Sequence, residues 1–70
     1  MTGAEVIQTL NSFTSRIEKT KSFEQWEALD AEKHKFWDGV DEKTKELSTV
    51  QAANKKFEDK MIIWSIVLAN

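Results

Sequence analysis

Residues 26–68, WEALDAEKHKFWDGVDEKTKELSTVQAANKKFEDKMIIWSIVL, carry a helical repeat through most of the chain. With Trp26 as position a of a heptad, ten of the thirteen a and d positions are apolar, and the other three are Lys33, Lys43 and Asn54. Apolar residues that recur at this spacing are typical of helices that pack side by side. The stretch therefore predicts helices, and no other segment supplies the partner that a lone strand would need.

One pair of residues, Asp38-Gly39, interrupts this repeat without shifting its register. Asp-Gly is a common turn and Asp41 is a good N-cap, whereas a single interior glycine costs a helix only about 1 kcal/mol relative to alanine. We favour a break here, with helices over about 23–37 and 42–68. The alternative is one continuous helix that contains Gly39, which would make the molecule a long helical hairpin.

A separate set of signals predicts the first helix. Thr2 and Glu5 spell a capping box, in which each side chain accepts a hydrogen bond from the other residue's backbone N–H. The apolar residues that follow are spaced by four, three and four, so they share one helix face: Val6, Leu10, Phe13 and Ile17. These signals predict a helix over about 3–20 and a tight turn at 20–22.

Length and composition limit the architecture. Seventy residues allow one domain, residues 1–70, and a chain of this size buries only about 60% of the surface that it exposes when unfolded. There is no proline, only two glycines and no cysteine, so the composition favours helices and excludes disulfides and cysteine-ligated zinc. We therefore predict an all-α fold, a small three-helix bundle or helical hairpin.

The last part of the chain predicts self-association. Residues 61–69 are apolar around the whole helical circumference, and two short helices offer them too little cover. We expect a second copy, or another protein, to cover the rest, and we predict a helical homo-oligomer. The expected interface is the heptad seam of the last helix: Leu47, Val50, Asn54, Phe57, Met61, Trp64 and Leu68.

Polar residues on this seam have two interpretations. A buried Asn54 would pair with its counterpart in a second copy and fix the register of the assembly. Alternatively, the seam rotates locally and Asn54 reaches water. For Lys33 and Lys43 we expect side chains that extend to the periphery of the bundle, because a lysine stem packs on apolar surface while its amine stays in water.

Charge is unevenly distributed along the chain. The net charge is −2, but residues 24–46 carry eight acidic residues against four lysines. Such a segment is either a solvated helix surface or a patch that meets a basic partner. Aromatic residues lie in the same segment, and tryptophan is common at the centres of protein interfaces. The expected partner-binding face has Trp37 as its exposed anchor, together with Trp26, Glu24, Glu27, Asp30 and Asp38.

No group of residues predicts catalysis. His34 is the only histidine, and one imidazole with Asp30 and Asp38 on an open helix face makes a poor metal site. The chain has no G-x-S-x-G motif and no glycine-rich phosphate loop, and no hydroxyl has the surroundings of an activated nucleophile. We therefore expect no enzymatic activity, no metal and no other cofactor.

These features favour binding as the function. We expect a small cytoplasmic interaction module, an inhibitor or adaptor that docks its acidic and aromatic helix face on a macromolecular target. No targeting segment is visible at the start, and the apolar run 61–69 has about half the length of a membrane span. By analogy alone, small helical chains of this kind are typical of phage and mobile-element proteins that act on host machinery.

Two alternatives use the basic residues instead. An oligomeric small-molecule sponge would hold an anionic nucleotide between cations, and a nucleic-acid accessory protein would place the same cations on phosphates. An acidic chain lacks the broad positive field of a nucleic-acid binder, so nucleic acid is the weaker of these expectations. The candidate anion-binding residues form two groups: Arg16, Lys19 and Lys21, and Lys55, Lys56 and Lys60.

Overall fold

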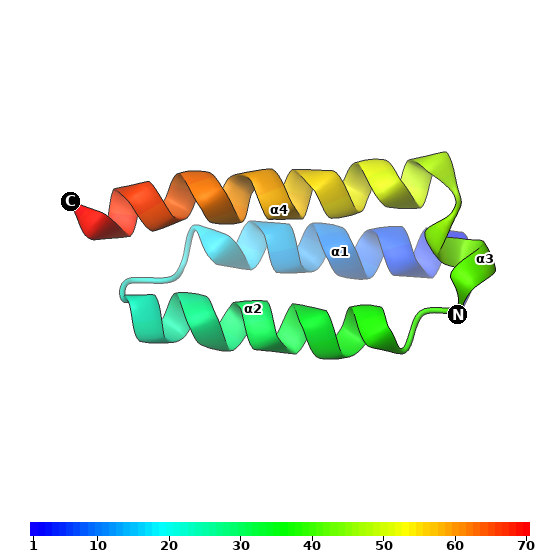
Figure 1. Ribbon diagram of the computed structural model, residues 1–70, viewed down its shortest axis with the longest axis horizontal. Helices are drawn as coiled ribbons and strands as arrows, with labels where there is room; N and C mark the ends of the chain where they lie inside the picture. Colours follow the sequence, from blue (N-terminus) through cyan, green and yellow to red (C-terminus); the bar gives the residue numbers. More distant parts are fainter.

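The computed structural model, which describes residues 1–70, contains four helices and no strand (Figure 1). The helices are α1 (Gly3–Ile17), α2 (Phe23–Asp38), α3 (Glu42–Lys45) and α4 (Ser48–Ala69). Figure 1 shows α1, α2 and α4 side by side, with α1 and α4 running in the same direction and α2 antiparallel to both. The short α3 turns the corner between α2 and α4. The all-α prediction is confirmed, and the three longer helices form a bundle.

The N-terminal cap of α1 matches the prediction from Thr2 and Glu5. The N–H of Thr2 donates to Oε1 of Glu5 at 2.8 Å, and the N–H of Glu5 donates to Oγ1 of Thr2 at 3.2 Å. The helix ends at Ile17, three residues before the predicted end at 20. The reason is that the Thr20 hydroxyl donates to the carbonyl of Ile17 at 2.7 Å, in a tight last turn from which the chain leaves toward α2.

The start and the end of α2 both follow from local hydrogen bonds. The Ser22 hydroxyl accepts the N–H of Gln25 at 3.2 Å, and the Gln25 side chain accepts the N–H of Lys21 at 2.7 Å. At the other end the N–H of Gly39 donates to the carbonyl of Phe36. The helix stops at Asp38, so the break is present and the continuous helix is not formed.

The segment predicted as one helix over 42–68 is divided. Asp41 caps the one-turn helix α3, because its carboxylate accepts the Thr44 hydroxyl at 2.6 Å and the Thr44 N–H at 3.2 Å. Helix α4 then starts separately after Leu47, whose backbone is extended. The chain must reverse direction between antiparallel α2 and α4, and residues 39–47 make this turn. The heptad register continues through the turn, so the apolar spacing alone gives no sign of it.

The core consists of two clusters of buried side chains along the bundle. The first core cluster lies toward α3 and contains Val6, Leu10, Val40, Val50 and Ala53. The second core cluster contains Phe13, Ile17, Leu29, Phe57 and Met61. Helix α1 contributes to both clusters and packs most extensively against α4. Burial of each large apolar side chain contributes about 1.5–3 kcal/mol, so these two clusters hold α1 against its neighbours.

The molecule is elongated, with principal extents of 39 × 18 × 15 Å. None of its helices combines the length and the apolar character that crossing a membrane requires.

Candidate functional site

Four of the predicted partner-binding residues form a surface on the outer side of α2. Leu29 and Lys33 point into the bundle, so helical positions on the opposite side face the solvent. Three of the acidic side chains are exposed and the fourth, Asp30, is half-buried. We call this set the acidic face of α2: Glu24, Glu27, Asp30 and Asp38.

Three carboxylates of the acidic face have no partner of opposite charge. The chain contains six ion pairs, and none of them includes Glu24, Glu27 or Asp38. Asp30 differs, because its Oδ1 lies 3.3 Å from Nδ1 of His34. Lys35 is the only exposed lysine of α2 and has no ion pair. The face therefore carries a net negative charge that is available to a partner.

The two tryptophans of the predicted face lie at the packed side of α2. Both are half-buried. The Trp26 indole donates to the carbonyl of Met61 at 3.0 Å, and Trp37 packs against the first core cluster. The expectation of an exposed Trp37 anchor is therefore corrected. The two indoles cover the core and link α2 to its neighbours, while Glu24, Glu27 and Asp38 lie on the exposed side of the helix.

The side chain of Lys33 is buried, contrary to the predicted position at the periphery. Only 2% of its surface is exposed, and its amine donates to Oε1 of Glu58 at 2.7 Å. The same amine lies 5.2 Å from the ring centroids of both Trp37 and Phe57, at cation–π distance. The lysine thus fastens α2 to α4 from the inside, and neither Glu58 nor this role was visible in the spacing.

The predicted oligomer seam lies largely inside the single chain. Val50, Phe57 and Met61 belong to the two core clusters, so a second copy would find almost no exposed surface on them. The Trp64 indole is also used within the chain, because it donates to the carbonyl of Thr20 at 3.2 Å. The reason is that α1 occupies the side of α4 that the heptad pattern reserved for a partner. Leu47 is exposed and Leu68 half-buried, at opposite ends of α4.

Asn54 lies half-buried between these core residues. Its Oδ1 is buried and accepts no hydrogen bond. An unpaired buried carbonyl oxygen costs about 1–3 kcal/mol. The side chain thus lies at the edge of the core with this oxygen turned inward, and within the chain no donor reaches the oxygen.

An apolar surface whose residues were not predicted lies on the outer side of α4, in its last turns. Four large apolar side chains there expose between 49% and 63% of their surface. We call them the C-terminal apolar face of α4: Ile62, Ile63, Ile66 and Val67. The apolar character of residues 61–69 was the signal for this face, but the expected interface was the heptad seam on the opposite side of α4.

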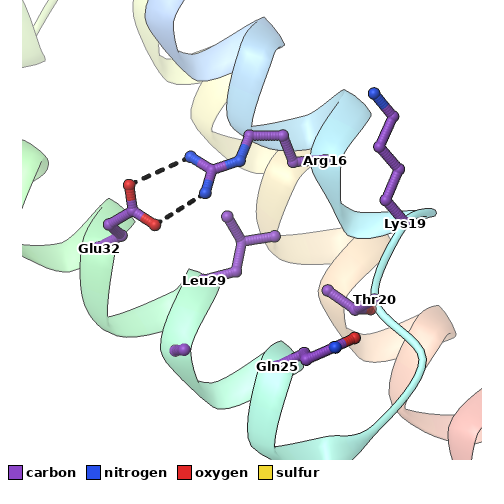
Figure 2. A pocket seen from close by; sticks show the side chains of 7 residues that line it. Arg16, Lys19, Thr20, Gln25, Leu29 and Glu32 are labelled. Atoms are coloured by element: carbon purple, nitrogen blue, oxygen red, sulfur yellow. Dashed lines mark hydrogen bonds and ion pairs between the residues drawn. The ribbon is translucent and has the colours of Figure 1, made fainter.

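The first group of candidate anion-binding residues is centred on Arg16. Its guanidinium donates to both carboxylate oxygens of Glu32, at 3.2 and 2.9 Å, and this hydrogen-bonded pair holds the pKa of Glu32 below its usual range (Figure 2). Lys19 points away from this pair, and Lys21 lies outside the pocket beside it. The pocket has a volume of about 310 Å³ and is lined by Arg16, Lys19, Thr20, Gln25, Ala28, Leu29 and Glu32.

The second group is also partly neutralised within the chain. Lys55 lies 3.2 Å from Asp59, and Lys60 lies 2.9 Å from Glu18, whereas Lys56 has no ion pair. A shallow depression of about 460 Å³ between α1 and α4 includes Lys55 and Lys56, together with Asp59. Of the six candidate cations, the three in ion pairs are less available to an anionic ligand.

The charged groups do not gather into a metal site: no cluster of three or more His, Cys, Asp or Glu side chains has the geometry to hold a metal ion. Comparison with protein-family models finds no family that matches the chain, and comparisons with curated proteins and with solved structures find none that is similar. The surfaces themselves therefore carry the functional argument.

Proposed function

We propose that the protein is a small protein-interaction module, an inhibitor or adaptor, that docks the acidic face of α2 on a basic macromolecular target. The observation that carries this proposal is the set of three exposed carboxylates, Glu24, Glu27 and Asp38, that lack a cation within the chain. Unpaired charges on one face attract and orient a partner of opposite charge, and they speed its association.

The shape of this helix face supports the same proposal. Ala28 and Ala31 are exposed on α2, and their short side chains leave room among the longer acidic ones. A basic side chain of a partner can therefore approach the helix closely and reach a carboxylate on either side. Trp26 and Trp37 serve this function by holding α2 rigidly on the bundle, which keeps the carboxylates in fixed positions.

We also infer that the protein acts in the cytoplasm as a homo-oligomer. The support for self-association is the exposed apolar surface at the end of α4, in a chain too small to cover it. An oligomer would present several copies of the acidic face at once, which raises the apparent affinity for a partner that has repeated basic sites.

A charge-neutralised variant tests the proposal. In Glu24→Gln, Glu27→Gln, Asp38→Asn, the acidic face loses three negative charges without loss of volume. The matched control loses three charges elsewhere, in Glu42→Gln, Glu46→Gln, Asp59→Asn, all of which are exposed. Circular dichroism checks that both variants keep the helical content of the parent.

The readout is a tagged pull-down from lysate of the source cell at low and moderate salt, with mass spectrometry of the retained proteins. We expect one protein to be retained by the parent and the control but lost with the acidic-face variant. This protein should be released as salt rises, because at 0.1 M salt the attraction between exposed charges is largely screened beyond about 10 Å. Equal retention by both variants contradicts the proposal. A melting temperature that rises with micromolar nucleotide would instead favour the sponge, and salt-dependent DNA binding the accessory protein.

A further inference from the structure

The outer side of α4 changes character along one continuous helix. In its first half this side carries Ala52, Lys55, Lys56 and Asp59, and in its last turns it carries only the C-terminal apolar face. Charged residues keep the first half in water, whereas isoleucine and valine on the same side of the same helix disfavour contact with water. The last turns of α4 are therefore suited to contact with another surface.

The spacing of this face is symmetric along the helix. Positions 62, 63, 66 and 67 are evenly disposed about the midpoint between residues 64 and 65, so reading α4 in either direction gives the same pattern. They form two parallel ridges, each made of residues four apart, with a groove between them. When a second copy lies antiparallel on this face about that midpoint, each of the four residues is level with another residue of the same face, as an isologous contact requires.

The charges around the face also favour a second copy over other occupants. Residues 61–70 carry no charged side chain. The Trp64 indole of α4 donates to the carbonyl of Thr20, and the Trp26 indole of α2 donates to the carbonyl of Met61 in α4. This end of α4 is thereby held beside the start of α2, where Lys21 and Glu24 lie exposed. Lys21 and Glu24 together carry no net charge, so they do not draw this end of the bundle to an anionic membrane surface, whereas a second copy presents both signs of charge and can match them.

The area of the face is compatible with a weak dimer. A typical stable interface takes about 800 Å² from each partner, and four side chains that are 49% to 63% exposed supply roughly half of that. Phe23, at the same end of the bundle beside Trp26, is exposed as well. Contacts of this size belong to the transient class of protein assemblies.

We infer that a second copy of the chain docks on the C-terminal apolar face of α4, antiparallel and related by a twofold axis near residues 64 and 65. In this arrangement Ile62 packs beside the partner's Val67, and Ile63 beside the partner's Ile66. The inference rests on the proposed self-association and names its surface, which is opposite to the heptad seam. The acidic face of α2 is not needed for it.

Sedimentation of the purified chain tests the surface. We expect a reversible monomer–dimer equilibrium between about 10 and 500 μM, the range of a weak interface. Ile66→Glu should weaken the dimer at least tenfold, because it buries a charge in the contact, and Ile63→Ser should weaken it as well. Ala52→Glu is the matched control: it places the same carboxylate on the same side of α4 in its charged half, and the dimer should persist.

Cysteine crosslinking tests the orientation, since the chain has no cysteine of its own. In an antiparallel contact Asp59 is level with the partner's Asn70, while the two Asn70 residues lie about 16 Å apart along the helix axis at 1.5 Å per residue. Asp59→Cys mixed with Asn70→Cys should form a disulfide-linked dimer, and Asn70→Cys alone should not. If Asn70→Cys crosslinks with itself, and the mixture yields no disulfide between position 59 of one chain and position 70 of the other, the antiparallel arrangement is overturned.

Three results would overturn the inference: a chain that stays monomeric over the whole concentration range, a dimer that survives Ile66→Glu, or a monomer that binds vesicles of phosphatidylcholine and phosphatidylglycerol through this face. The test is separate from that of the proposed function. If the dimer forms and the acidic-face variant still captures the same target, the docking proposal fails and the dimer surface stands. If the chain is monomeric but captures its target through α2, the reverse holds.

Discussion

The ammonium group of Lys33 has three attractive neighbours and almost no contact with water. Glu58 accepts its hydrogen bond, and the ring centroids of Trp37 and Phe57 both lie 5.2 Å from it. Removing a charge from water costs several kcal/mol, and the nearby carboxylate and the two aromatic faces offset this cost. Glu58 is itself 44% exposed at its side chain, so the pair is buried at the lysine end only.

This asymmetry predicts unequal effects of two substitutions. Glu58→Ala leaves a buried ammonium without its carboxylate, and we expect the free energy of unfolding to fall by about 2 kcal/mol. Lys33→Met keeps the volume and removes the charge, so it should be nearly neutral or stabilising. Urea denaturation measures both.

The double variant is the control for this pair. In the Lys33→Met background there is no buried charge to strand, so Glu58→Ala should cost less than about 0.5 kcal/mol. If Glu58→Ala is as costly there as in the parent, the effect comes from packing of the glutamate stem, and the ion pair is unimportant.

The burial of Lys33 and its pairing with Glu58 could not be predicted from the sequence. The heptad placed Lys33 on the seam correctly, but a seam lysine normally extends to the periphery. Its carboxylate partner lies 25 residues further along the chain, and that pairing depends on how α2 and α4 pack. The same holds for Asn54, since its position on the seam was evident but its lack of a hydrogen-bond partner was not.

Among the helices and their connections, Gly39 offers a substitution with a clear sign. It has φ −85° and ψ −7°, a right-handed helical conformation that any residue adopts, and an added Cβ would lie 3.5 Å from the carbonyl oxygen of Phe36, an ordinary contact. Gly39→Ala should therefore raise the free energy of unfolding by about 0.5–1 kcal/mol, chiefly because alanine restricts the unfolded chain.

Gly3→Ala serves as the comparison for Gly39→Ala in the same denaturation experiment. A Cβ at position 3 would meet Cδ1 of Leu47 at 2.9 Å, so that side chain would have to move. We expect a smaller gain there. Loss of stability in Gly39→Ala would mean that the turn after α2 needs a conformation that alanine resists.

Helix α1 and the break after Asp38 were predictable because their signals are local: a capping box and evenly spaced apolar residues in one case, an Asp-Gly pair in the other. The division between α3 and α4 was not. It arises from the need to reverse direction between antiparallel helices. Neither Glu46 nor Leu47 is a residue that typically ends a helix, as glycine or proline would be. The acidic residues of α2 were predicted, but which side of the helix Trp37 takes depends on the placement of α4.

For the molecule as a whole, three carboxylates link stability to pH. Hydrogen bonds from the Thr2 backbone, from Arg16 and from the Thr44 hydroxyl lower the pKa values of Glu5, Glu32 and Asp41 respectively. The unfolded chain therefore binds protons more readily than the folded chain. The contribution of these three carboxylates to stability should be fully present above their ordinary pKa values of 4.5 and 3.8. It should be lost as the pH falls through the lower pKa values of the folded chain.

The measurement is the urea midpoint at neutral pH and at about pH 3, where the folded chain should be less stable. Thr44→Val keeps the shape of a buried side chain but removes the hydroxyl, so the pKa of Asp41 should rise toward 3.8, as followed by NMR titration. The pH dependence of stability should then lose the contribution of Asp41 and keep those of Glu5 and Glu32. A midpoint that does not change between the two pH values would contradict this account.

The two core clusters also differ in their aromatic neighbours, and this has an optical consequence. Trp37 packs against the first core cluster, with the ammonium groups of Lys33 and Lys45 near its ring, whereas Trp26 and Trp64 pack against the second and donate to backbone carbonyls. The chain has no tyrosine, so its fluorescence is dominated by these three indoles. A variant that keeps Trp37 alone reports on the end near α3, and one that keeps Trp64 alone reports on the opposite end. The protein thus contains its own probes of whether both ends of the bundle melt in one step.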